Sequence, residues 1–151
     1  MKEKKILVSG TYSGLGKFLF SKIGSHKYKR NMNIRKYNNT NWDVIIHCGF
    51  YTGENIENMD ESIQHSLKIS LLKSRKFIFI SSLIVYENQK KRSENSKLKP
   101  RNSMYANSKI ISESFFDKKK TLILRLGTLV GNSMRKNKIN KLLYEKKPKL
   151  S

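Results

Sequence analysis

Cysteine, proline, long apolar runs and acidic side chains are all scarce in this sequence of 151 residues. The single cysteine, Cys48, excludes an internal disulfide, and its place in an apolar run is typical of a buried thiol in a reducing compartment. No stretch approaches the roughly 20 consecutive apolar residues of a membrane span. The basic start at 1–5 soon reaches a glycine turn, unlike a signal peptide. We therefore expect one cytoplasmic domain with no leader and no membrane anchor.

Acidic residues number 11 against 32 Lys and Arg, which gives a formal net charge of +21. A basic field attracts polyanions, so nucleic acid is the first partner to weigh. However, most of the excess is Lys, and no helix-turn-helix, zinc-finger or aromatic RNA-binding motif accompanies it. We expect a solvated basic surface and no nucleic-acid partner. The basic clusters are scattered, at 27–36, 90–101, 118–120 and 135–149.

Short apolar runs alternate with helical patterns along the chain. Helical spacing predicts helices at 14–23, 60–72 and 104–116, and a basic segment holds a weak strand signal around 28–34. Strands that alternate with helices of this length predict an α/β fold, a Rossmann-like doubly wound parallel sheet with helices on both faces. We expect a dinucleotide-binding domain at 1–131 and a short basic tail at 132–151. The clear buried strands are predicted at 5–9, 42–48, 77–81 and 121–126.

A glycine-rich loop at 10–16 follows the first strand and opens the first helix. Gly10 permits a sharp turn, Gly14 permits a pyrophosphate to approach the backbone, and Gly16 permits close packing of helix and strand. The helix N-terminus adds free amides and a positive dipole end. A plain structural turn is the alternative, but the strand-turn-helix context favours a dinucleotide. The predicted cofactor-binding residues of this loop are Gly10, Tyr12, Ser13, Gly14, Leu15 and Gly16.

A second group of residues consists of Tyr105 and Lys109, with Ser81 and Ser82 ending a strand some twenty residues earlier. Tyr105 and Lys109 are four apart and share a helix face. A free tyrosine has a pKa near 10, and a nearby ammonium favours the phenolate, which brings the phenol toward the range of acid/base work. A serine at the carboxyl end of a strand can polarise a substrate oxygen. The spacing alone is equally typical of an ordinary surface pair.

These motifs, in this order, resemble the extended short-chain dehydrogenases/reductases, the NAD-dependent epimerase/dehydratase family of nucleotide-sugar enzymes. The resemblance covers about 4–131. It implies Tyr105 as acid/base, Lys109 as the residue that lowers the phenol pKa and holds the ribose, and Ser82 in preference to Ser81 as the substrate-polarising hydroxyl. It also implies hydride transfer on a nucleotide-sugar substrate and a homodimer through the helix that carries Tyr105. The matching segments are 6–16, 43–47, 79–86, 99–109 and 124–127.

The sequence departs from this family in its glycine spacing and in the basic segment that follows the first helix. The glycines have the GxxxGxG spacing of the shorter branch of the family, and no acidic residue lies between 24 and 42 to take the adenosine ribose hydroxyls. Lys29, Arg30 and Arg35 offer positive charge for a 2′-phosphate instead. The expected cofactor is NAD or NADP, and the basic residues favour NADP. Arg30 is expected to be one of the residues that bind it.

The second departure is at the carboxyl end, where family members continue into a substrate domain. About twenty residues follow Gly131, and we expect them to form at most one helix. The predicted function is therefore an NAD(P)-dependent oxidoreductase, epimerase or dehydratase, and the alternative is a non-catalytic NAD(P)-binding module. No metal is expected, because His47 and Cys48 have no partners at ligand spacing. His47 is interpreted as a core histidine.

Overall fold

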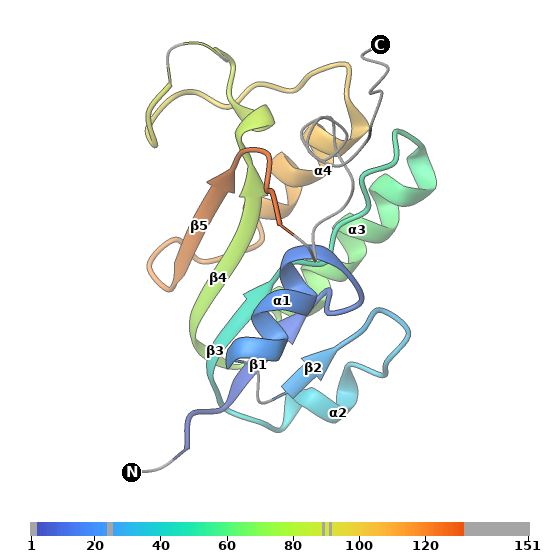
Figure 1. The fold of residues 1–151 in the computed structure, drawn as a ribbon, viewed down its shortest axis with the longest axis vertical. Coiled ribbons are helices and arrows are strands. Elements are labelled where there is room, and N and C mark those ends of the chain that lie inside the picture. Colours follow the sequence, from blue (N-terminus) through green and yellow to red (C-terminus); the bar gives the residue numbers. More distant parts are fainter. Residues whose placement is uncertain (1–2, 24–25, 89, 91, 132–151) are drawn as a thin grey trace.

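The computed structural model describes residues 3–23, 26–88, 90 and 92–131, and the tail predicted at 132–151 lies outside them. Five parallel strands form one sheet in the order β2-β1-β3-β4-β5 (Figure 1). This is the Rossmann-like α/β fold that the alternating pattern predicts. The strands are β1 (Ile6–Ser9), β2 (His26–Tyr28), β3 (Trp42–His47), β4 (Ser74–Ser82) and β5 (Thr121–Leu126).

Helices cover both faces of the sheet. The helix α1 (Gly14–Ile23) lies on one face, while α3 (Ile56–Ser70) and α4 (Met104–Glu113) pack side by side on the other (Figure 1). Right-handed crossovers give this arrangement, because the strand order runs one way from β1 to β2 and the other way from β3 to β5. A four-residue helix, α2 (Arg35–Asn38), and a 3₁₀ turn, η1 (Leu83–Val85), complete the described elements. No described helix has the length and apolarity that crossing a bilayer requires.

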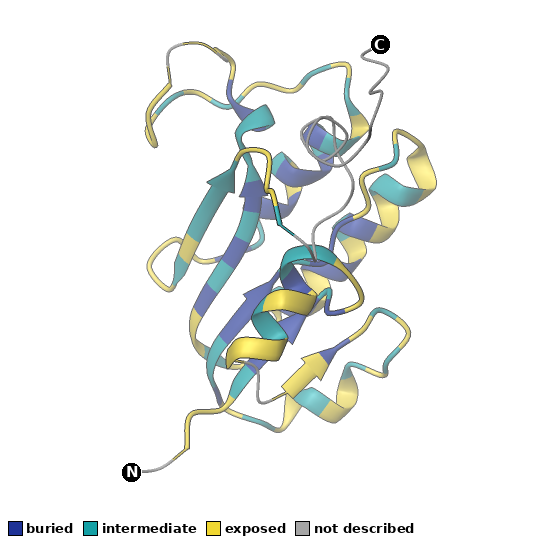
Figure 2. Cartoon of the chain, in the orientation of Figure 1, coloured by how far each residue is buried: buried dark blue, intermediate teal, exposed yellow. Residues whose placement is uncertain are grey.

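The main hydrophobic core lies between the sheet and the pair α3 and α4. Fully buried side chains from β1, β3, β4 and α3 meet there, among them Leu7, Ile45, Phe79 and Ile69. Figure 2 shows that buried residues are concentrated in the central strands and in parts of the helices. The strands are rich in branched and aromatic side chains, which pack well on a pleated sheet. The core thus holds the carboxyl ends of the central strands rigidly at one edge of the sheet.

A buried polar chain crosses this core at His47. The Nδ1 atom of His47 is 2.6 Å from Ser9 Oγ, and its Nε2 atom is 2.9 Å from Ser66 Oγ. The Ser66 hydroxyl in turn donates to the Ser62 carbonyl oxygen at 2.8 Å. His47 therefore ties β1, β3 and α3 together, in agreement with its interpretation as a core histidine. Burial lowers the pKa of His47 well below its usual value, so the ring is neutral.

The structure corrects several predicted boundaries. The prediction of a weak strand around 28–34 is wrong, because β2 ends at Tyr28. Tyr28 is buried and stacks on His65, with ring centroids 5.4 Å apart. Helix α3 begins at Ile56 because the Asn55 side chain caps it, accepting from the Asn58 amide at 2.8 Å. The first two residues of α3, Ile56 and Glu57, are exposed. Helix α4 ends at Glu113, before the apolar pattern ends.

Candidate functional site

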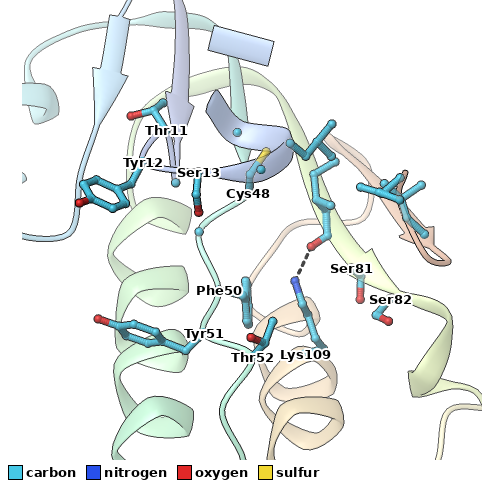
Figure 3. Close-up of a pocket in the computed structure, with 18 of the residues that line it drawn as sticks. Thr11, Tyr12, Ser13, Cys48, Phe50, Tyr51, Thr52, Ser81, Ser82 and Lys109 are labelled. Carbon is cyan, nitrogen blue, oxygen red and sulfur yellow. Dashed lines mark hydrogen bonds between the residues drawn. The ribbon is translucent and has the colours of Figure 1, made fainter. Parts of the chain in front are cut away.

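A cavity of about 680 Å³ opens where the carboxyl ends of β1, β3 and β4 meet (Figure 3). The strand order reverses between β1 and β3, and open parallel sheets bind ligands outside such a reversal. Its volume lies within the range of small-molecule sites. Except for Arg35, the residues that the sequence predicts for catalysis or cofactor binding line this one cavity, namely Gly10, Tyr12, Ser13, Gly14, Leu15, Gly16, Lys29, Arg30, Ser82, Tyr105 and Lys109.

Each of the three glycines of the loop is required for a different structural reason. Gly10 has a φ of +73°, and an added Cβ would lie 2.6 Å from the Gly49 Cα atom. A Cβ at Gly16 would collide with the Gly10 carbonyl oxygen. Gly14 also has a positive φ, +58°, but nothing lies within 4 Å of an added Cβ. Gly10 and Gly16 therefore serve packing, whereas Gly14 leaves open space beside the backbone at the start of α1.

Lys109 is buried, with 3% of its surface exposed. Its Nζ donates to the Ile80 carbonyl oxygen at 2.6 Å and lies 3.4 Å from the centroid of the Phe50 ring (Figure 3). Burial lowers the pKa of Lys109 to about 7, although Cys48 and Glu113 act in the opposite direction. The amine therefore loses its proton more readily than an ordinary lysine does.

Tyr105 lies one helical turn before Lys109 on α4, and both side chains reach the cavity. The Lys109 Nζ is 5.7 Å from the centroid of the Tyr105 ring, so the two members of the expected pair lie near each other. The neighbouring Cys48 is half-buried, and burial raises the pKa of its thiol to about 12. Cys48 is accordingly protonated and unsuited to act as a nucleophile.

The two serines at the end of β4 project to opposite faces of the sheet, because side chains alternate along a strand. Ser81 follows Phe79 on the face toward α4 and is buried. Its Oγ atom has no hydrogen-bond partner among the described residues. Ser82 is half-buried, and its Oγ accepts from the Ile84 amide at 3.4 Å at the start of η1. Both hydroxyls line the cavity, but only Ser82 is engaged with the backbone.

The polar groups of the cavity suit a phosphate-bearing ligand. Thr11 and Ser81 both have buried hydroxyls without a partner in the described part of the chain, and such groups are costly unless a ligand or water meets them. No carboxylate is found among the described residues that line the cavity, whereas Lys29, Arg30 and Lys109 are. With the open space at Gly14, this donor set fits a dinucleotide whose phosphates lie at the loop.

The basic segment after β2 reaches the cavity only in part. Lys29 and Arg30 line it, but Arg35 is exposed on α2 and does not, so Arg35 is excluded from the expected set. The Arg30 guanidinium lies 3.4 Å above the Tyr51 ring centroid and is 3.5 Å from a Glu61 carboxylate oxygen. These contacts hold the Arg30 side chain along one wall of the cavity.

Sequence reasoning missed the wall that follows β3. Phe50 lies beneath Lys109, Tyr51 lies beneath Arg30, and the carboxylate of Glu54 reaches the start of α4. No local pattern indicates the contact of Phe50, because Lys109 is distant in the chain. No local pattern indicates Glu54, because its partners lie about fifty residues away.

No protein-family model matches the sequence, and no curated protein sequence matches it. Solved structures do share the fold. A dTDP-4-dehydrorhamnose reductase from Yersinia enterocolitica matches with a TM-score of 0.73 at 20% identity, over 93% of this chain and 59% of that chain.

Two further structures match over a similar extent. A UDP-glucuronic acid 4-epimerase from Bacillus cereus, in complex with NAD, has a TM-score of 0.70 at 20% identity, over 92% of this chain and 61% of that chain. A dTDP-4-dehydrorhamnose reductase from Bacillus anthracis str. Ames, in complex with NADP, has a TM-score of 0.65 at 19% identity, over 83% of this chain and 54% of that chain.

These likenesses confirm the fold that the family resemblance implied. They also show that the chain spans between 54% and 61% of the length of these three structures.

Proposed function

We propose that this chain binds a nicotinamide dinucleotide and acts on a nucleotide-sugar substrate as a reductase, epimerase or dehydratase, with Tyr105 as the acid/base. The observation that carries the proposal is one cavity that joins the glycine loop to Tyr105, Lys109 and two serines, with no carboxylate among the described residues that line it. The similar structures support it, since they are nucleotide-sugar enzymes and two of them hold NAD or NADP.

In this proposal the backbone amides at the start of α1 and the Ser13 hydroxyl hold the phosphates beside Gly14. A bound nicotinamide supplies the hydride chemistry. Tyr105 then moves the substrate proton at its phenol oxygen, while Ser82 donates to the substrate oxygen. Lys109 would supply positive charge near that phenol and would hold the ribose of the bound cofactor. The protein thus contributes orientation and proton transfer.

The direct test is hydride transfer in a single turnover, followed by nicotinamide absorbance, with a panel of nucleotide sugars. Tyr105→Phe should remove turnover and leave cofactor affinity almost unchanged, because phenylalanine keeps the ring but has no proton to exchange. Phe115→Tyr is the control, because it exchanges the same two residue types at a position that does not line the cavity around the glycine loop. It should leave turnover unchanged. Full activity in Tyr105→Phe would overturn the mechanism.

A preference for NADPH over NADH is part of the proposal. Lys29 and Arg30 lie just beyond β2, where a dinucleotide fold recognises the adenosine ribose, and no carboxylate among the described cavity residues would repel a 2′-phosphate. Titration of both cofactors decides the matter. Tighter binding of NADH than of NADPH to the wild type, or an unchanged NADPH preference in Arg30→Ala, would contradict this part of the proposal.

A second candidate function is a non-catalytic NAD(P)-binding module. It is supported by the engagement of Lys109, whose amine is held by the Ile80 carbonyl oxygen and the Phe50 ring. Cofactor binding with no hydride transfer on any sugar nucleotide would favour this module over the enzyme.

A further inference from the structure

Glu54 connects the loop after β3 to the start of α4. Its Oε1 accepts from the Ser103 hydroxyl at 3.0 Å. Its Oε2 accepts from the Met104 amide at 2.7 Å and from the Tyr105 amide at 3.5 Å. One carboxylate therefore contacts three consecutive residues, the last of which carries the predicted acid/base.

The Glu54 carboxylate provides acceptors for free amides at the start of α4. The first amides of a helix have no partner within the helix, and a negative charge there is favourable. Ser103 is the N-cap, and its hydroxyl accepts from the Ala106 amide at 3.2 Å. The first turn of α4 contains no acidic residue of its own. Glu54, in the loop after β3 and about fifty residues earlier in the chain, supplies a carboxylate there.

The same loop forms a wall of the cavity. Phe50 and Tyr51 line it and contact Lys109 and Arg30, and the Tyr51 amide donates to Ser62 Oγ at 3.1 Å. Its position is thus fixed against α3 before it reaches α4. A ligand that contacts this wall and the phenol of Tyr105 meets two surfaces that the Glu54 hydrogen bonds connect.

We propose that Glu54 is a positioning residue for Tyr105, fixing the start of α4 against the cavity wall and so the place of the phenol relative to the glycine loop. The inference rests on the proposed function for its effect on turnover. Glu54 contacts neither cofactor nor substrate in this account and acts through the backbone of α4. A cap that served stability alone would leave the phenol in place when removed.

The test compares Glu54→Ala with Glu54→Gln in the full chain, and uses Glu57→Ala as the control. Glu57 carries the same charge, is exposed and lies in the first turn of α3. The cofactor-free readouts are hydrogen exchange at the Met104 and Tyr105 amides and the ¹⁹F resonance of fluorotyrosine placed at 105. The activity readout separates kcat from the KM for cofactor.

In Glu54→Ala we expect faster exchange at both amides, a shifted or broadened ¹⁹F resonance, and a kcat about tenfold lower or more with little change in KM, because small misplacements of a reacting group are costly. Glu54→Gln keeps an oxygen acceptor for the Met104 amide and should restore most of each property. Glu57→Ala should match the wild type.

The ¹⁹F resonance separates this inference from the proposed function. An unchanged resonance in Glu54→Ala, or an unchanged kcat despite faster exchange, would overturn the positioning role and leave Glu54 as a cap. A wild type without turnover on any nucleotide sugar would count against the proposed function, while the resonance would still decide the role of Glu54.

Discussion

At the scale of single residues, the cavity contains groups whose chemistry depends on burial. Lys109 has a pKa of about 7 because it is buried against Phe50, whereas Cys48 beside it remains protonated at neutral pH. The glycine loop and the Tyr105 to Lys109 spacing could be predicted from sequence, since both are local patterns. The contacts of Phe50 and Glu54 could not, because they join segments that are distant in the chain.

Ser81 and Ser82 give a prediction at this scale. Ser81→Ala removes a buried hydroxyl that lacks a partner among the described residues, so the cofactor-free melting temperature should stay the same or rise. Ser82→Ala removes the acceptor of the Ile84 amide and should cost about 0.5–1 kcal/mol. On adding NADPH, Ser81→Ala should show the smaller stabilisation. Thermal melts with and without cofactor test both. Equal destabilisation by the two changes would mean that Ser81 has a protein partner.

At the scale of elements, the position of the sheet relative to α3 depends on His47. The strand pattern predicted β3 and a position for His47 in the core. The hydrogen-bond partners of His47, Ser9 and Ser66, lie on other elements, and no local sequence pattern indicates them. The hydrophobic core and this polar chain together fix the edge at which the cavity opens.

Ser66→Ala tests that chain. It leaves His47 Nε2 buried without its partner at 2.9 Å, so we expect a loss of about 1–3 kcal/mol in the free energy of unfolding. Ser70→Ala is a matched control on the same helix, because its hydroxyl also donates to a backbone carbonyl but is less buried. Urea denaturation measures both. A Ser66→Ala loss no larger than that of Ser70→Ala would contradict the structural role of the chain.

At the scale of the whole molecule, stability should depend on pH through the buried histidines. Burial lowers the pKa of His65 to about 4, whereas in the unfolded chain it returns to its usual value near 6.5. The unfolded state therefore binds the proton first, and stability that is full above pH 6.5 falls as the pH drops toward 4. His65 alone should account for about 3 kcal/mol across that window. His47 acts in the same direction.

His65→Phe isolates this contribution from the carboxylates that also titrate in acid. The variant keeps an aromatic ring against Tyr28 but removes the titrating group. The free energy of unfolding, measured by urea from pH 7 to 4, should fall less steeply in His65→Phe than in the wild type. Equal slopes would show that His65 does not contribute.

The central claim is that the cavity beside the glycine loop binds a nicotinamide dinucleotide. The most direct measurement is calorimetric titration of NADPH and NADH into the wild type, Gly14→Ala and Gly14→Leu. Both variants bear the same strain at a positive φ, but only leucine extends far into the open space beside Gly14. We predict binding to the wild type, modest weakening in Gly14→Ala and loss of binding in a folded Gly14→Leu. Absence of binding of either cofactor to the wild type at millimolar concentration, or full affinity in Gly14→Leu, would contradict the account.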